Sequence, residues 1–158
     1  MLVLDKEDEL LLQEYNWYLN GRYWAGTRWC KKTKQREKVL LHRLIMGALP
    51  GQQVDHINRD REDNRRCNLR LATPSQNLAN QTKKPGATSL YKGVCQPSKR
   101  RRWKAGIRGP HGRIHLGSYA SEQEAAYVYD KYAEFIHGEF ALTNGITLGT
   151  LIEEKENV

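Results

Sequence analysis

Apolar and polar residues alternate along two stretches in the second half of the chain. Residues 102–108 and 113–117 each place an apolar side chain at every second position, and Gly109–Gly112 forms a turn between them. A period of two is that of a half-buried strand. A further strand is expected at residues 90–94, so the pattern predicts a three-stranded antiparallel sheet with one apolar face.

The period becomes helical after residue 120. Ser121 and Glu124 form a capping box, and Gly138 ends the apolar pattern that follows. One face of the sheet would pack on the apolar side of this helix, whose positions recur at helical spacing. These positions are Ala125, Ala126, Tyr129, Tyr132, Ala133 and Ile136. The other face of the sheet would present four side chains together: Lys104, Arg108, Arg113 and His115.

The first half of the chain contains a predicted hairpin. Aromatic-rich runs flank Asn20-Gly21, a strong hairpin signal because both turn residues need a positive φ. We assign these aromatic side chains to a small core rather than to a base-stacking platform. A helical turn is expected within residues 5–14. A strand at 37–41 and a short helix at 42–46 are expected after the hairpin.

A strand–loop–strand–helix unit follows. Short strands are predicted at residues 53–57 and 68–73, separated by the polar segment 58–66. Thr73 can cap a helix, and Pro74 suits its first position. This order of elements is a ββα unit.

Breakers and small residues at 83–88 indicate a linker. We therefore expect one domain at residues 1–82, a second at 89–145 and a frayed acidic tail at 146–158. A chain of 158 residues can hold two small domains. The predicted fold class is α+β, with an N-terminal ββα unit and a C-terminal three-stranded antiparallel sheet packed on one helix.

Positive charge is concentrated in one block of the sequence. The net charge is +8, and residues 81–120 hold ten of the 26 Lys and Arg residues and no Asp or Glu. Such a block favours a polyanion through phosphate neutralisation and counterion release. Charge alone is equally consistent with a solvated basic face.

The composition argues against several other classes. No apolar run approaches the ~20 residues that span a bilayer, and the N-terminus turns acidic at once, unlike a signal peptide. The three cysteines form no Cys-x-x-Cys pair, which argues against a disulfide framework and against structural zinc. We therefore expect a cytoplasmic protein without a membrane partner.

Four polar residues have the spacing of a one-metal phosphodiesterase site. Asn68 follows His56 by twelve positions (68 − 56), and Asn77 follows Asn68 by nine (77 − 68). His56 is the natural general base because its ordinary pKa lies near neutrality. Asp55 offers a carboxylate ligand on the opposite side of the strand, and Asn77 offers a carbonyl oxygen. Asn68 is expected to accept a hydrogen bond from the His56 ring and fix its tautomer.

Two protein ligands leave room for phosphate oxygens and water, as Mg²⁺ prefers, with Mn²⁺ as the alternative. Arg43 stays open between a surface charge and a phosphate contact, and we assign its neighbour His42 as a structural histidine. An EF-hand interpretation of residues 55–63 fails, because its sixth position is Asp60 rather than glycine.

These motifs together resemble the HNH endonucleases of phages and mobile introns across roughly residues 5–82. The motifs are His42-Arg43, Val54-Asp55-His56-Ile57-Asn58, Asp63-Asn64-Arg65, Asn68-Leu69-Arg70 and Ser75-Gln76-Asn77. The resemblance implies a ββα-metal fold in which Asn68 orients the base His56, and Asp55 and Asn77 bind the metal. Asn77 stands where the motif's last histidine would be. The resemblance also implies a phage or bacterial source.

The second half resembles the AP2/ERF DNA-binding domain across roughly residues 88–144. The motifs are Tyr91-Lys92-Gly93-Val94, residues 103–108, residues 115–119, residues 124–130 and Asn144. That family lays a three-stranded sheet in the major groove of DNA. Lys92, Arg108 and Arg113 match positions where the family uses arginine.

Three neighbouring arginines, Arg100, Arg101 and Arg102, are expected to touch phosphates, which position a protein without specifying sequence. Cys95, Pro97 and His115 depart from the plant pattern of the family. The target sequence of the plant proteins therefore does not carry over.

The sequence thus predicts a metal-dependent HNH endonuclease of homing or nicking type. The C-terminal sheet would find double-stranded DNA, and the N-terminal unit would hydrolyse one phosphodiester bond. One catalytic site per chain predicts a nick from a monomer, and a double-strand break only from a weak dimer. Two alternatives stay open, namely a transcription regulator with an inactive HNH unit and an RNA-binding module supported by charge alone.

Overall fold

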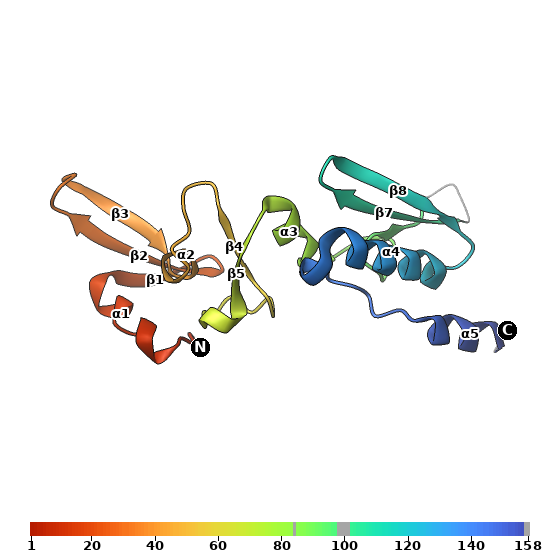
Figure 1. Ribbon diagram of the computed structural model, residues 1–158, viewed down its shortest axis with the longest axis horizontal. Coiled ribbons are helices and arrows are strands. Elements are labelled where there is room, and N and C mark those ends of the chain that lie inside the picture. The colour runs from red at the N-terminus through yellow and green to blue at the C-terminus, as the bar shows by residue number, and fades with distance from the viewer. Residues whose placement is uncertain (84, 98–101, 157–158) are drawn as a thin grey trace. The chain divides into compact units, whose positions relative to one another are not determined.

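The computed structural model describes residues 1–83, 85–97 and 102–156. It contains three antiparallel sheets, with helices before, between and after their strands along the chain (Figure 1). The predicted α+β class is confirmed. The chain divides into two compact units, Met1–Asn77 (unit 1) and Leu78–Val158 (unit 2). The division falls upstream of the segment 83–88 that the sequence favoured as a linker. In the described ranges, no helix is long and apolar enough to cross a membrane.

Unit 1 contains two antiparallel sheets, one of order β1-β2-β3 and one formed by β4 and β5. Its elements are η1 (Lys6–Asp8), α1 (Leu11–Glu14), β1 (Asn16–Asn20), β2 (Tyr23–Cys30), β3 (Gln35–Leu40), α2 (Leu41–Ile45), β4 (Gln53–His56), η2 (Arg66–Asn68), β5 (Leu69–Ala72) and the start of α3 (Pro74–Ala79), whose last two residues belong to unit 2. The start of α3 is capped as predicted. The backbone N–H of Gln76 donates to the Thr73 hydroxyl, and the Gln76 side chain accepts from the Thr73 N–H.

The predicted hairpin of β1 and β2 is present, but its turn lies one residue later than expected. Asn20 pairs with Tyr23, so the turn residues are Gly21 and Arg22. The expectation that both turn residues need a positive φ was wrong. Gly21 alone supplies one, at 64°, a conformation that glycine adopts without the steric cost of a Cβ.

The core of unit 1 joins the helix α2 to both sheets. Leu41 and Ile45 of α2 pack with Val54 and Leu69. Trp17 and Trp24 pack against this cluster, as predicted for the hairpin aromatics. Two other hairpin aromatics, Tyr18 and Trp29, project from the opposite face of the same strands and are exposed.

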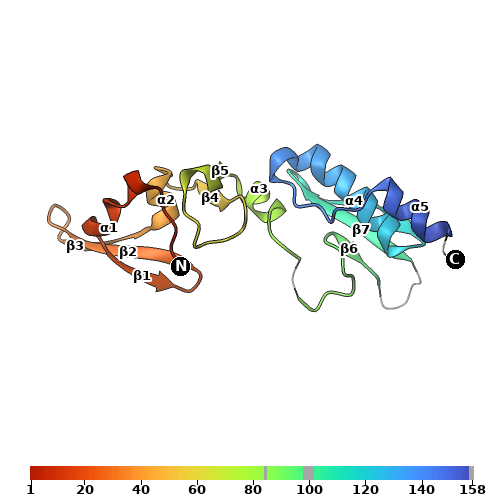
Figure 2. The same ribbon diagram turned by 90° about the horizontal axis from the view of Figure 1, so that it is seen from below.

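In unit 2, helix α4 lies along one face of the three-stranded sheet β6-β7-β8 (Figure 2). The elements are β6 (Val94–Cys95), β7 (Trp103–Gly109), β8 (Gly112–Tyr119), α4 (Glu122–His137), η3 (Gly138–Phe140) and α5 (Leu148–Glu156). The predicted capping of α4 is confirmed, because the Ser121 hydroxyl accepts a hydrogen bond from the Glu124 N–H. Gly138 ends the helix with a φ of 52°.

The first strand of this sheet is shorter than the predicted 90–94. Only Val94 and Cys95 pair with β7. The Gly93 carbonyl still accepts from the Gly106 N–H of β7 at 2.9 Å, but the backbone before it bonds to side chains. The Glu122 carboxylate accepts from the Leu90 N–H at 2.7 Å, and the Asn144 side chain accepts from the Lys92 N–H at 2.7 Å.

Two further expectations for unit 2 need correction. Tyr132 is 46% exposed rather than part of the core, whereas its near neighbour Asp130 is buried. The Asp130 carboxylate accepts hydrogen bonds from the backbone N–H groups of Asn144 and Ile146, which ties the chain after α4 back onto the helix. Residues 146–158, expected as a frayed tail, contain the helix α5.

A β-bulge sets which residues of β8 share a face with β7. Gly106 pairs with His115 but Ala105 pairs with Gly117, so Leu116 is the extra residue of β8. Beyond the bulge, Arg108 pairs with Arg113. The bulge thus turns Arg113 and His115 to the same side as Arg108.

Glycine at position 93 is required by both backbone and packing. Its φ is 76°, and a Cβ there would overlap the ring of Tyr129. Gly145 has a similar φ of 77° but open space around it. We expect Gly145→Ala to cost about 1–2 kcal/mol through φ strain alone. We expect Gly93→Ala to cost about 1–3 kcal/mol more through overpacking.

Urea denaturation of the two variants, followed by circular dichroism, measures this difference. Equal destabilisation by the two substitutions would show that the Tyr129 ring does not need the space at Gly93.

Candidate active site

The strand β4 carries two adjacent candidate residues on opposite faces. Asp55 pairs with Arg70 across the hairpin, whereas His56 pairs with Leu69. Because side chains alternate along a strand, His56 shares its face with Val54 of the core. Asp55 and His56 are each only 5% exposed. The end of β4 is therefore flanked by a carboxylate on one side and an imidazole on the other, as the sequence predicted.

The His56 ring sits in a small aromatic cluster. The ring centroids of His42 and His56 lie 5.2 Å apart with an edge-on geometry, and the Tyr23 ring lies 5.0 Å from His42. The guanidinium of Arg61 stacks over Tyr23 at 5.0 Å. These contacts fix the orientation of the imidazole from three elements, β2, α2 and the β4–β5 connection.

The environment keeps both histidines neutral. Burial, the His56 ring and Arg43 together lower the pKa of His42 to about 4. Burial also lowers the pKa of His56, against an opposing effect of its hydrogen bond to Asn64. A neutral imidazole can accept a proton, so His56 has the protonation state that a general base requires.

The ring partner of His56 is Asn64, not the predicted Asn68. Its Oδ1 lies 3.3 Å from His56 Nε2. The Asn68 side chain instead accepts from the backbone N–H of Asn58 at 2.9 Å and donates to the Asp63 carbonyl at 2.7 Å. Asn68 therefore closes the loop that carries Asn64. The sequence contained Asn64 within the motif Asp63-Asn64-Arg65, but spacing alone did not distinguish it from the neighbouring asparagines.

The loop between β4 and β5 is further fixed by charge. Asp63 accepts from Arg65 Nη2 at 2.7 Å and from the Asn58 amide at 2.9 Å. Hydrogen bonds from Arg65, opposed in part by burial, lower the pKa of Asp63 to about 2. The carboxylate thus stays ionised at neutral and moderately acidic pH.

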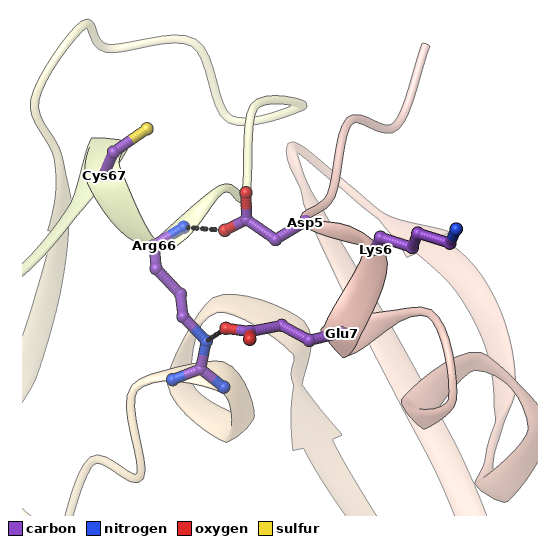
Figure 3. A pocket seen from close by; sticks show the side chains of 5 residues that line it. All are labelled: Asp5, Lys6, Glu7, Arg66 and Cys67. Atoms are coloured by element: carbon purple, nitrogen blue, oxygen red, sulfur yellow. Dashed lines mark hydrogen bonds and ion pairs between the residues drawn. The ribbon is translucent and has the colours of Figure 1, made fainter.

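The N-terminal segment holds the same loop from outside. The Val3 N–H donates to the Glu62 carbonyl at 2.8 Å, and the Val3 carbonyl accepts from the Asn64 N–H at 2.9 Å. Arg66 lines a surface depression and pairs with Glu7 at 3.0 Å (Figure 3). It also pairs with the buried Asp8 at 2.6 Å. The two acidic side chains of this depression, Asp5 and Glu7, both bond to Arg66, so the depression is a contact between two chain segments rather than a second site.

On the other face of β4, Asp55 forms an ion pair with Arg70 at 2.9 Å. The Asn77 amide of α3 donates to the Gln53 side chain at 2.7 Å, and Gln53 shares the face of Asp55. The two predicted metal ligands are therefore on one side of the β4–β5 hairpin. Arg70 could have been anticipated from sequence, because it lies opposite Asp55 once the two predicted strands are paired.

The chemistry of these donors fits a hard divalent cation. Asp55 brings a carboxylate, and Gln53 and Asn77 bring amide oxygens, which are ligands that Mg²⁺ accepts. Arg70 supplies the positive charge beside Asp55 in the structure, so a metal ion there would share or replace that contact. Within the described ranges, no group of three or more His, Cys, Asp or Glu side chains could hold a metal.

Arg43 has a structural position. Its guanidinium donates to the backbone carbonyls of Leu49, at 3.0 Å, and of Gln52, and so holds the turn between α2 and β4. Whether it also contacts a phosphate stays a prediction.

The structure brings four predicted DNA-binding residues of unit 2 onto one sheet face. Lys104, Arg108, Arg113 and His115 share the side that faces away from α4. Arg102, just before β7, is exposed. The Lys92 ammonium instead contacts the Ala79 carbonyl, so its side chain points away from this face. Arg100 and Arg101 lie outside the described residues.

Comparison with known proteins matches one segment of the chain to a family and most of the chain to a viral protein. The sequence model of a family described as HNH endonuclease matches residues 39–79, which run from the end of β3 to the end of α3. An uncharacterized HNH endonuclease of Acanthamoeba polyphaga mimivirus is 33% identical over 138 residues, covering 86% of this chain and 70% of the relative. No solved structure matches the chain.

The lowered pKa of His42 predicts a pH-dependent stability of unit 1. The folded-state pKa of about 4 lies below the ordinary 6.5, so the unfolded chain binds the proton more readily. Stability is therefore fully present above pH ~6.5 and falls by up to about 3 kcal/mol as the pH approaches 4. We expect His42→Gln to flatten this profile.

Urea denaturation at a series of pH values tests the expectation. Tryptophan fluorescence reports mainly unit 1, which holds three of the four tryptophans, Trp17, Trp24 and Trp29. His111→Gln, at an exposed turn of unit 2, is the matched control. An unchanged slope in His42→Gln would show that His42 is not the group responsible.

Proposed function

Because this chain belongs to the HNH endonuclease family, we propose that it is a metal-dependent nuclease that hydrolyses a phosphodiester bond in double-stranded DNA. The observation that supports this most directly is the presence of a buried, neutral His56 and a buried Asp55 carboxylate as the last two residues of β4. Their side chains leave the strand on opposite faces, so a phosphate at the end of the strand is where both would act on it.

In this mechanism His56 accepts a proton from the water that attacks the phosphorus. Because the Asn64 amide oxygen can only accept, its contact with Nε2 puts the ring proton on that nitrogen, and Nδ1 is the nitrogen that would take the proton from water. The His42 ring packs edge-on against the imidazole and helps to hold it. Asn68 acts on His56 only indirectly, because it fixes the loop on which Asn64 lies. The low pKa of His56 keeps the ring available as a base near neutral pH.

Asp55 and Asn77 would hold a divalent ion, with Mg²⁺ preferred and Mn²⁺ as the alternative. Such an ion supplies charge neutralisation at the phosphate and at the leaving oxygen. Arg70 holds the buried Asp55 carboxylate in place, because an unpaired buried carboxylate would be costly.

Unit 2 would deliver the DNA. Its exposed basic face, with Arg108 and Arg113 paired across β7 and β8, has the width of a strand pair and suits the major groove. The proposal retains the AP2/ERF-like role for this sheet and a homing or nicking type of cleavage. With one site per chain, a monomer would cut one strand.

The rival proposal is a DNA-binding regulator with an inactive HNH unit. It accounts for the basic face of unit 2. It leaves unexplained why unit 1 combines a buried imidazole that is held neutral with a buried carboxylate at the end of one strand.

Cleavage of supercoiled plasmid decides between the two proposals. We expect Mg²⁺-dependent nicked product, its loss in EDTA, and a loss of at least about 100-fold in rate for His56→Ala, because general-base catalysis contributes that much. Asp55→Asn should lose metal-dependent activity. His111→Gln is the control for a histidine outside the site. Full activity of His56→Ala would remove it as the base, and intact plasmid with tight retention of DNA would favour the regulator.

The role of the sheet is tested separately by binding. Arg108→Ala should weaken binding to a selected duplex by about 1–3 kcal/mol and relax sequence preference. Lys131→Ala, on the exposed side of α4, is the matched control. Selection from a library of random duplexes supplies the target. An unaltered preference in Arg108→Ala would contradict major-groove reading by this face.

A further inference from the structure

A second basic surface lies on unit 1, on the sheet β1-β2-β3. In an antiparallel sheet, directly opposed residues point to the same side. Thr27 pairs with Lys38, and Trp29 pairs with Arg36. Tyr18 of β1 lies on this side as well, since the Lys38 ammonium is 5.8 Å from its ring. We call Tyr18, Trp29, Arg36 and Lys38 the β2–β3 strip.

The strip lies on the same sheet face as a residue of the candidate active site. Tyr23 precedes Trp29 by six positions on β2, so both side chains point to one side of the sheet. The Tyr23 ring packs 5.0 Å from that of His42 and 6.3 Å from that of His56. One face of β2 therefore extends from Tyr23, beside the His56 imidazole, to Trp29, next to the turn between β2 and β3.

The charge on this face is available to a ligand. All four side chains of the strip are exposed, and Trp29 is 61% exposed. Within residues 1–83, no ion pair engages Arg36 or Lys38. On the opposite face, Arg28 is already paired with Glu37 at 3.0 Å. The turn that joins β2 to β3 adds three exposed lysines, Lys31, Lys32 and Lys34.

We infer that the β2–β3 strip binds the sugar–phosphate backbone of duplex DNA on one flank of the scissile phosphate. The position of this DNA contact beside the active site rests on the proposed nuclease function. The choice of DNA as the ligand rests on the positive charge of the strip. A duplex whose phosphate reaches His56 would pass along the face of the sheet β1-β2-β3 on which the Tyr23 side chain lies. Arg36 and Lys38 neutralise phosphates there, and Trp29 packs against the backbone. Unit 1 thus holds DNA by itself, in addition to the sheet of unit 2.

The test is the salt dependence of binding by the full chain. A short duplex of random sequence is titrated in EDTA, so that cleavage plays no part. Each phosphate contact contributes about 0.9 to the slope of log affinity against log salt. The double variant Arg36→Gln/Lys38→Gln should therefore lower the slope by about 2 and the affinity by about 30-fold near 0.15 M salt.

Two further variants sharpen the result. Arg28→Gln removes one positive charge from the opposite face of the same strands and should change the slope by much less than the ~0.9 that one phosphate contact contributes. Thr27→Lys adds a positive charge opposite Lys38, on the same face as the strip, and should steepen the slope by about 1. Thermal unfolding of each variant checks that unit 1 is folded.

Each outcome bears on the inference. An unchanged slope in both the double variant and Thr27→Lys would overturn it, and an equal loss in Arg28→Gln would show that the face is immaterial. Tighter binding of a structured RNA than of the duplex would overturn the choice of ligand. Plasmid cleavage decides the nuclease separately. A reduced slope in the double variant together with intact plasmid would support DNA binding by the strip and contradict the nuclease function. Plasmid cleavage together with an unchanged slope would support the nuclease function and contradict DNA binding by the strip.

Discussion

The structure of unit 1 depends on the closure of the loop between β4 and β5 by buried polar side chains. Asn68 bonds to the backbone of Asn58 and Asp63, and Asp63 in turn bonds to the Asn58 amide. Buried amides and carboxylates are tolerated only when their hydrogen bonds are made, so the loop adopts one conformation or loses several bonds together. That single conformation places Asn64 beside the His56 ring.

Charge has different uses in the two units. Unit 1 buries carboxylates and pairs each with an arginine, as in Asp55 with Arg70 and Asp8 with Arg66. Such pairs add little net stability but specify which segments meet. The sheet of unit 2 instead presents Arg108 and Arg113 to solvent. Arginine therefore joins chain segments within unit 1 and gives unit 2 an exposed positively charged surface.

The sequence predicted elements with a clear period and missed contacts that depend on irregular backbone. The alternation in β7 and β8 and the capping by Thr73 and Ser121 were found because each involves residues close in sequence. The partner of His56 was not found, because the loop passes through a positive φ at Arg59 that no pattern indicated. The shortened first strand of unit 2 arose from Asn144, more than fifty positions away from Lys92 (144 − 92 = 52).

The β-bulge at Leu116 makes the binding face tolerant of a change in strand length at one position and sensitive to it at others. Leu116 is the residue that the pairing with β7 leaves over, so its deletion would give a regular strand in which Arg113 and His115 keep the side of Arg108. An insertion of one residue between the bulge and Arg113 would instead turn Arg113 toward α4, because side chains alternate along a strand. Evolution can therefore lengthen or shorten β8 at the bulge without losing the basic face, whereas the same change nearer the turn would remove one of its arginines.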